Sequence, residues 1–201
     1  MSDSAEQNFQ REAKIRELLV QEIRDGEDLA SEARRMVGFL LLEKKGYAPG
    51  DIRKSAAFEV RLGGETAWSS LDFIVSLDGR IGMIIKCAAG SLDSRQRQAV
   101  AAARVISPMI VPVAVVADPV NAHVLDGVSG RLTGEGFGSI PVKDQLQAIL
   151  AAAGTESLAP ARQEKEKRIL LAFDAIKCCV PQGADGGVPI GEPSDKKASD
   201  G

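Results

Sequence analysis

The fold is decided by the stretch SSLDFIVSLDGRIGMIIKCAAGSL, residues 69–92. Two runs of mostly apolar residues flank Asp78-Gly79, a dipeptide that favours the two-residue turn of a β-hairpin. The sequence therefore predicts two antiparallel strands, over residues 70–77 and 81–87.

The residues that follow predict a crossover. Ser91 is a suitable cap for a helix that runs to about Ile106, and Pro108 ends it. Residues 109–117 are almost all apolar, which is typical of a strand buried on both faces. A strand, helix and strand in this order predict a parallel pair joined by a right-handed connection.

Two shorter signals complete the sheet. A strand over residues 56–62 precedes Gly63-Gly64, and another around 122–125 precedes a glycine-rich stretch at 127–138. We therefore expect an α/β domain with a mixed sheet flanked by helices.

Helical spacing of apolar residues predicts the remaining elements. The expected helices cover residues 8–25, 29–45, 143–152 and 164–177, with Asp28 as a cap and Gly46 as a stop for the second. The tail has few apolar residues and is predicted to be disordered. The chain thus divides into an N-terminal helical extension (1–26), the α/β domain (27–142), C-terminal helices (143–180) and a tail (181–201).

Composition excludes several classes of protein. No apolar run approaches the roughly 20 residues that span a bilayer, and the polar N-terminus is unlike a secretory signal. We expect a cytoplasmic protein with no membrane partner. Three cysteines and one histidine, His123, are too few for a zinc site, because adjacent Cys178 and Cys179 lack the usual spacer.

Charge is informative only locally. The net charge of −3 argues against a protein that coats nucleic acid with its whole surface. Residues 91–104 nevertheless carry Arg95, Arg97 and Arg104 against Asp93 alone. This run is either a solvated helix face or a patch that contacts phosphates.

One pair of charges falls inside the predicted hairpin. Asp72 lies in the first strand and Lys86 near the end of the second, so an antiparallel turn at 78–79 brings both to the same end. Counting from the turn places residue 85, give or take one, opposite Asp72. The pair is either an ordinary ion pair at a sheet end or part of a phosphodiesterase site, in which a carboxylate holds Mg²⁺ and a lysine assists water attack.

Here a family resemblance enters. The stretches EARRMVGFLLLEKKGYAPGDIRKSAAFEV (32–60) and SLDFIVSLDGRIGMIIKCAAGSL (70–92) resemble the N-terminal domain of type I restriction enzyme R subunits. The resemblance covers about residues 27–142. It implies a restriction-endonuclease-like fold and a PD-(D/E)xK metal site for Mg²⁺-dependent DNA cleavage.

The resemblance also implies roles for particular residues. The strand acid would be Asp72, the lysine Lys86 and the helix-borne acid Glu32. A glutamine on the following helix would be Gln96 or Gln98, and we prefer Gln96 because it shares a stripe with apolar residues that face the sheet.

The sequence departs from that pattern at the metal site. The acid expected two residues before the lysine is Ile84, and the proline of the motif is replaced by Leu71. Since one carboxylate holds Mg²⁺ weakly, either Glu32 or Glu59 would have to supply a second ligand.

Three functions follow. The chain is a Mg²⁺-dependent nuclease that uses Asp72, Glu32 and Lys86, or a non-catalytic module on the same fold that binds DNA, RNA or a protein through Arg95 and Arg97. The third is a structural domain that pairs with a second copy or another protein through the helices at 8–25 and 164–177. No GxxxxGK[ST] motif is present, so the chain carries no ATPase site of that kind.

Overall fold

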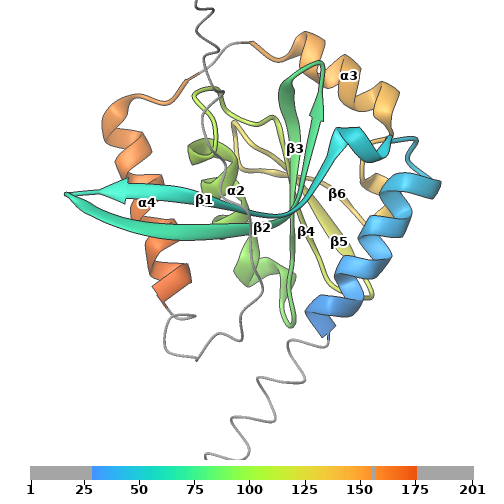
Figure 1. The fold of residues 1–201 in the computed structure, drawn as a ribbon, viewed down its shortest axis with the longest axis horizontal. Coiled ribbons are helices and arrows are strands. Elements are labelled where there is room, and N and C mark those ends of the chain that lie inside the picture. Colours follow the sequence, from blue (N-terminus) through green and yellow to red (C-terminus); the bar gives the residue numbers. More distant parts are fainter. Residues whose placement is uncertain (1–28, 155–156, 176–201) are drawn as a thin grey trace, which may run out of the picture.

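Six strands form one mixed sheet in the computed structural model of the chain, which describes residues 29–154 and 157–175 (Figure 1). The strands are β1 (Ile52–Leu62), β2 (Glu65–Leu77), β3 (Arg80–Cys87), β4 (Val113–Ala117), β5 (Ala122–Asp126) and β6 (Leu132–Glu135). The helices are residues 29–43, α2 (Leu92–Val105), α3 (Lys143–Ala152) and α4 (Pro160–Ala175), with 3₁₀ turns η1 (Pro49–Asp51) and η2 (Phe137–Ser139). The predicted 8–25 helix, the Asp28 cap and the tail lie outside the described residues.

The strand order across the sheet is the order in the chain, β1 to β6. Every neighbouring pair is antiparallel except β3 and β4, which are parallel and joined by α2. Asp78 and Gly79 have φ of 51° and 76°, as a type I′ turn requires. The prediction of an α/β domain with a mixed sheet, a central hairpin and a crossover is therefore confirmed.

Several boundaries differ from the prediction. β1 and β2 begin four and five residues earlier than expected, and β6 forms inside the glycine-rich stretch that carried no strand signal. β4 begins at Val113 instead of residue 109, because Pro112 has no amide to give to a ladder. α4 begins at Pro160, a residue that suits the first turn of a helix.

Both faces of the sheet are covered, and this makes its central strands apolar on both sides. The 29–43 helix and α3 pack on one face through Val37, Leu41 and Leu146. α2 and α4 pack on the other through Ala103 and Leu170. Figure 1 shows the two helical layers on either side of the strands. All five residues of β4 are buried, as expected for a strand between two layers.

The β1–β2 hairpin extends beyond the rest of the sheet as an arm, seen at the left of Figure 1 in front of α4. Its inner face is buried against α4 through Phe58, Val60 and Leu71. Ser55 has a φ of 49°, which interrupts β1 where the arm leaves the central sheet. This junction lies beside Asp72 and positions the candidate site.

No helix among the described residues is long and apolar enough to cross a membrane.

Candidate functional site

Asp72 and Lys86 both lie where the β2–β3 ladder ends. The last pair in register is Phe73 with Ile85, and the same register continued by one residue sets Asp72 opposite Lys86. Counting from the turn gave residue 85 because an irregularity between Val75 and Ser76 shifts the pairing by one. Asp72 reaches Arg34 of the helix that covers the face opposite to α2, whereas Lys86, which alternates with Ile85 along β3, lies on the α2 side.

The Asp72 carboxylate is engaged by two donors from the protein. Its Oδ2 accepts the backbone N–H of Cys87 at 2.7 Å, and its Oδ1 lies 3.4 Å from Nε of Arg34, on the 29–43 helix. Burial raises the pKa of the Cys87 thiol well above its usual range, and the negative charge of Asp72 raises it further. Asp72 therefore accepts a hydrogen bond from an amide and forms an ion pair with the Arg34 guanidinium, whose Nε donates to the Ala30 oxygen.

Lys86 is held inside the sheet. Its side chain is 4% exposed, and its Nζ donates to the backbone oxygen of Ser70 at 2.9 Å. Burying an ammonium group is costly unless it is hydrogen-bonded and near negative charge. The backbone oxygen of Ser70 supplies such a hydrogen bond.

The position where the family pattern has an acid is part of the core. Ile84 is completely buried and belongs to the cluster between the sheet and α2. It shares a face with Lys86, two residues along β3, as the sequence predicted. No carboxylate reaches the site from this position.

Neither expected replacement acid is placed to help Asp72. Arg34 is the residue of the 29–43 helix that reaches Asp72, and residues two apart on a helix do not face the same way, which turns the exposed Glu32 away. Glu59 is held by Arg61 at 2.7 and 2.8 Å. It lies four positions along β1 from Ser55, the residue in register with Asp72, or about 13 Å away.

These neighbours do not fit a magnesium site. Mg²⁺ requires oxygen ligands in octahedral geometry, whereas Asp72 is met by an amide N–H and a guanidinium, both of which are donors. Within the described ranges no group of three or more His, Cys, Asp or Glu side chains could hold a metal ion. The expectation of Glu32 and Asp72 as joint ligands therefore lacks support in the geometry.

The two candidate glutamines face different ways. Gln96 lies against β5, with its Nε2 2.9 Å from Nδ1 of His123 and 2.8 Å from Oδ1 of Asp93. Gln98 is 1% exposed and donates to Asp174 of α4. Lys86, Val116 and His123 form one row across β3, β4 and β5, so Gln96 stands at the far end of the row that contains Lys86, about 10 Å from it.

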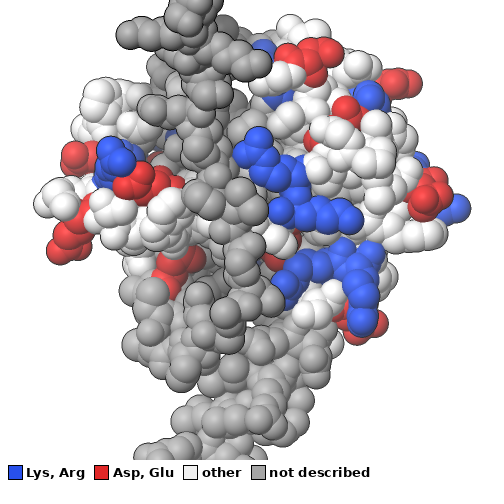
Figure 2. Space-filling view, in the orientation of Figure 1, with Lys and Arg blue, Asp and Glu red and all other residues white. Residues whose placement is uncertain are grey.

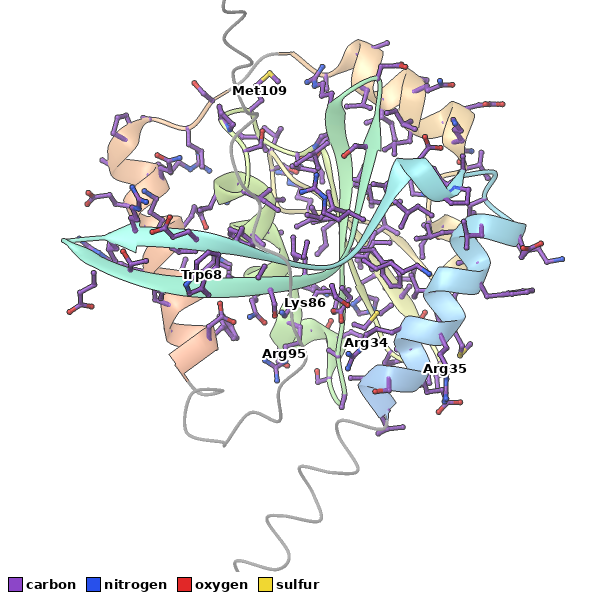
Figure 3. All side chains as sticks on the ribbon, viewed as in Figure 1. Arg34, Arg35, Trp68, Lys86, Arg95 and Met109 are labelled. Carbon is purple, nitrogen blue, oxygen red and sulfur yellow. The ribbon has the colours of Figure 1, made fainter. Side chains whose placement is uncertain are left out.

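Arg95 and Arg97, expected as nucleic-acid contacts, also separate. Arg97 lies 2.5 Å from Oε2 of Glu166 on α4, so its charge is used inside the protein. Arg95 is half-buried near the start of α2, beside Lys86 in the view of Figure 3. Arg95 is thus the member of the pair that remains a candidate contact.

A band of positive charge surrounds this end of the sheet. Figure 2 shows Lys and Arg side chains gathered near the centre of one face, with most Asp and Glu side chains toward its edges. Figure 3 places Arg34 and Arg35, from the 29–43 helix, in that region with Lys86 and Arg95. We call Arg34, Arg35 and Arg95 the basic band; Lys86, which is 4% exposed, lies inside the sheet and is not part of it. The N-terminus of α2 points to the same end of the sheet, and its backbone dipole also favours anions.

Sequence reasoning missed Arg34. The signal that could have found it is Gly38, four residues later on the same helix face, where a Cβ would meet the Phe73 ring at 3.5 Å, an ordinary van der Waals distance. This face of the helix therefore packs on β2, with Arg34 near Asp72, the residue next to Phe73.

Comparison with models of protein families, with curated proteins and with solved structures gave no match in any of the three.

Proposed function

We propose that the chain is a non-catalytic nucleic-acid-binding module built on a restriction-endonuclease-like core. The fold assignment is supported by the element order: a helix, three antiparallel strands, a crossover helix and a parallel strand. This is the order that the resemblance of residues 27–142 to the type I restriction R-subunit domain implies.

One observation supports the non-catalytic part of the proposal. Arg34 forms an ion pair with Asp72, the strand acid of the implied motif, and the buried Ile84 stands where the motif has its second strand acid. A guanidinium beside a carboxylate opposes a divalent cation by charge repulsion. The site keeps positive charge without a metal.

The binding chemistry follows from that charge. Arg35 is exposed and Arg95 half-buried, and both stand at the end of the sheet to which the α2 N-terminus points. Arginine is suited to bidentate contact with phosphate oxygens. The overall charge of −3 keeps binding confined to this face.

Binding to labelled 20-nucleotide DNA and RNA, followed by fluorescence anisotropy between 50 and 200 mM salt, tests the proposal. We expect affinity to fall with salt, and the double variant Arg35→Ala, Arg95→Ala to bind at least about tenfold more weakly with a log–log salt slope smaller by about 1.5. Arg131→Ala is the control, because Arg131 is exposed at the opposite edge of the sheet, between β5 and β6. Equal affinity of the wild type and the double variant would refute the proposed face.

The nuclease alternative has its own readout. Supercoiled plasmid and single-stranded DNA incubated with Mg²⁺ or Mn²⁺ should remain intact with the wild type. Cleavage by the wild type that disappears in Asp72→Ala would replace the proposed module with an enzyme. Cleavage that appears only in Ile84→Glu would identify Ile84 as the residue that disables an ancestral site.

A further inference from the structure

The arm formed by β1 and β2 carries an exposed tryptophan. Trp68 is 56% exposed and is the only tryptophan of the chain. It lies opposite Glu59 in the ladder, on the face of the arm turned away from α4. The inner face is occupied by the buried side chains of Phe58 and Val60, so Trp68 has no role in that core.

The surroundings of Trp68 leave its ring accessible. The flanking pairs on the same face are Ala57 with Ser70, two small side chains that cannot cover an indole, and Arg61 with Thr66, of which the Arg61 guanidinium contacts Glu59. The carboxylate of Glu59 is held by Arg61 through two contacts, so its charge is compensated beside the ring. A large apolar surface is thus presented in a neutral setting.

Trp68 is connected to the basic band along β2. Ser70 and Asp72 follow Trp68 on the same face of the strand, about 7 and 13 Å away, and Asp72 forms an ion pair with Arg34. In Figure 3 Trp68 lies on the arm, and Arg95, Arg34 and Arg35 follow one another from there toward the 29–43 helix. An aromatic platform therefore adjoins a track of positive charge.

We infer that this face binds single-stranded nucleic acid, with a base stacked on Trp68 and the adjoining phosphates on the basic band; the inference rests on the proposed function. Every nucleobase has a face that can stack on an aromatic ring, whereas bases inside a duplex are already stacked on each other. A platform beside a cationic track is the combination that recognises single strands without reading sequence.

The intrinsic fluorescence of the protein reports on this residue alone. Titration with a 20-nucleotide oligothymidylate or oligouridylate should quench the Trp68 emission. An abasic oligonucleotide with the same number of phosphates should bind about tenfold more weakly and leave the emission unchanged. A 20-base-pair duplex should also leave it unchanged.

Variants separate stacking from packing. Trp68→Ala should weaken binding of the labelled oligothymidylate about tenfold, with Trp68→Phe close to the wild type because phenylalanine retains a stacking face. Leu132→Ala is the control, since Leu132 is an exposed apolar residue of β6 at the other edge of the sheet. Circular dichroism checks that each variant is folded.

The outcomes distinguish two failures. If the base-bearing and abasic strands bind equally, with no quenching and no effect of Trp68→Ala, the stacking inference is overturned while the phosphate-binding proposal stands. If neither strand binds, the proposed function itself fails. Quenching by the duplex as strong as by the single strand would also overturn the inference, because stacking would not require free bases.

Discussion

Asp72 illustrates how one contact changes the chemistry that a residue performs. The same aspartate that resembles a metal ligand in the sequence accepts an amide from Cys87 and lies beside the Arg34 guanidinium. A carboxylate with two donors around it stabilises the end of the β2–β3 ladder. Its surroundings, an amide and a guanidinium, differ from the oxygen ligands that its residue type suggests.

A second ion pair yields a prediction on pH. Nζ of Lys143, at the start of α3, lies 2.7 Å from Oδ2 of Asp51 in η1, and this hydrogen bond, followed by that from the Ala48 amide, holds the pKa of Asp51 below its usual value. Because the carboxyl pKa is lower in the folded chain, its contribution is present above the ordinary value of about 3.9 and is lost as the pH falls through the lower folded value.

Lys143→Met should therefore lower the free energy of unfolding by about 1 kcal/mol at pH 7, since both side chains still reach solvent in part. The difference from the wild type should shrink as the pH falls below the ordinary carboxyl value of about 3.9 and through the lower folded pKa of Asp51. Urea unfolding at pH 7 and at acid pH measures it. Lys44→Met, at an exposed lysine without this contact, serves as control. A difference of the same size at both pH values would contradict the assignment to Asp51.

At the scale of elements, the segment before β4 and the segment after β5 approach each other closely through their backbones. The amide of Gly127, just after β5, donates to the oxygen of Pro112, just before β4, at 2.8 Å. A Cβ at Gly127 would lie 1.9 Å from the backbone oxygen of Val111. Only a residue without a side chain allows these segments to meet.

Gly127→Ala should accordingly lower the free energy of unfolding by about 3 kcal/mol, because a backbone segment would have to move. Gly138→Ala is the matched control: nothing lies within 4 Å of a Cβ at that position, and the expected change is below about 0.5 kcal/mol. Urea unfolding of both variants measures the difference. Equal stabilities of the two variants would show that the segment before β4 can move at little cost in free energy.

At the scale of the whole molecule, α4 is joined to the rest of the fold by a buried acid. Glu166 is 2% exposed and receives Nη1 of Arg104 at 2.8 Å and Nη2 of Arg97 at 2.5 Å, both from α2. Arg104, which is 6% exposed, also donates to the backbone oxygens of Gly127 and Val128. This network links α2, α4 and the turn after β5.

Removing the acid should leave a buried charge without its partner. We expect Glu166→Ala to lower the free energy of unfolding by about 3–5 kcal/mol. Glu164→Ala, on the same helix with a 57% exposed side chain, should change it by less than about 0.5 kcal/mol. Urea unfolding compares them. A mild effect of Glu166→Ala would mean that α4 is held by its apolar contacts, such as those of Leu170, and not by this network.

The parts of the site that could be predicted are those that depend on residues close together in the sequence. Asp78-Gly79 placed Asp72 and Lys86 at one end of a hairpin, and the stripe on α2 placed Gln96 against the sheet. Arg97 was expected on the surface because its partner, Glu166, lies more than 60 residues later, and no pattern near Arg97 indicates that the two will pair. The partner of a charged side chain is chosen by packing between distant elements.

The amino-acid order alone determined the hairpin, the crossover and the mixed sheet, because turn geometry and apolar periodicity act between residues close in the chain. Only the tertiary structure decided that Arg34 and not Glu32 faces Asp72, that Ile84 completes the core, and that Trp68 stands exposed beside the basic band. The physical reason is that the rotation of a helix against a sheet depends on packing between residues far apart in the sequence, such as that of Val37 and Leu41 in one cluster with Phe73. The periodicity of apolar residues predicts which face of a helix or strand is buried, but it does not predict which residues of other elements will contact that face.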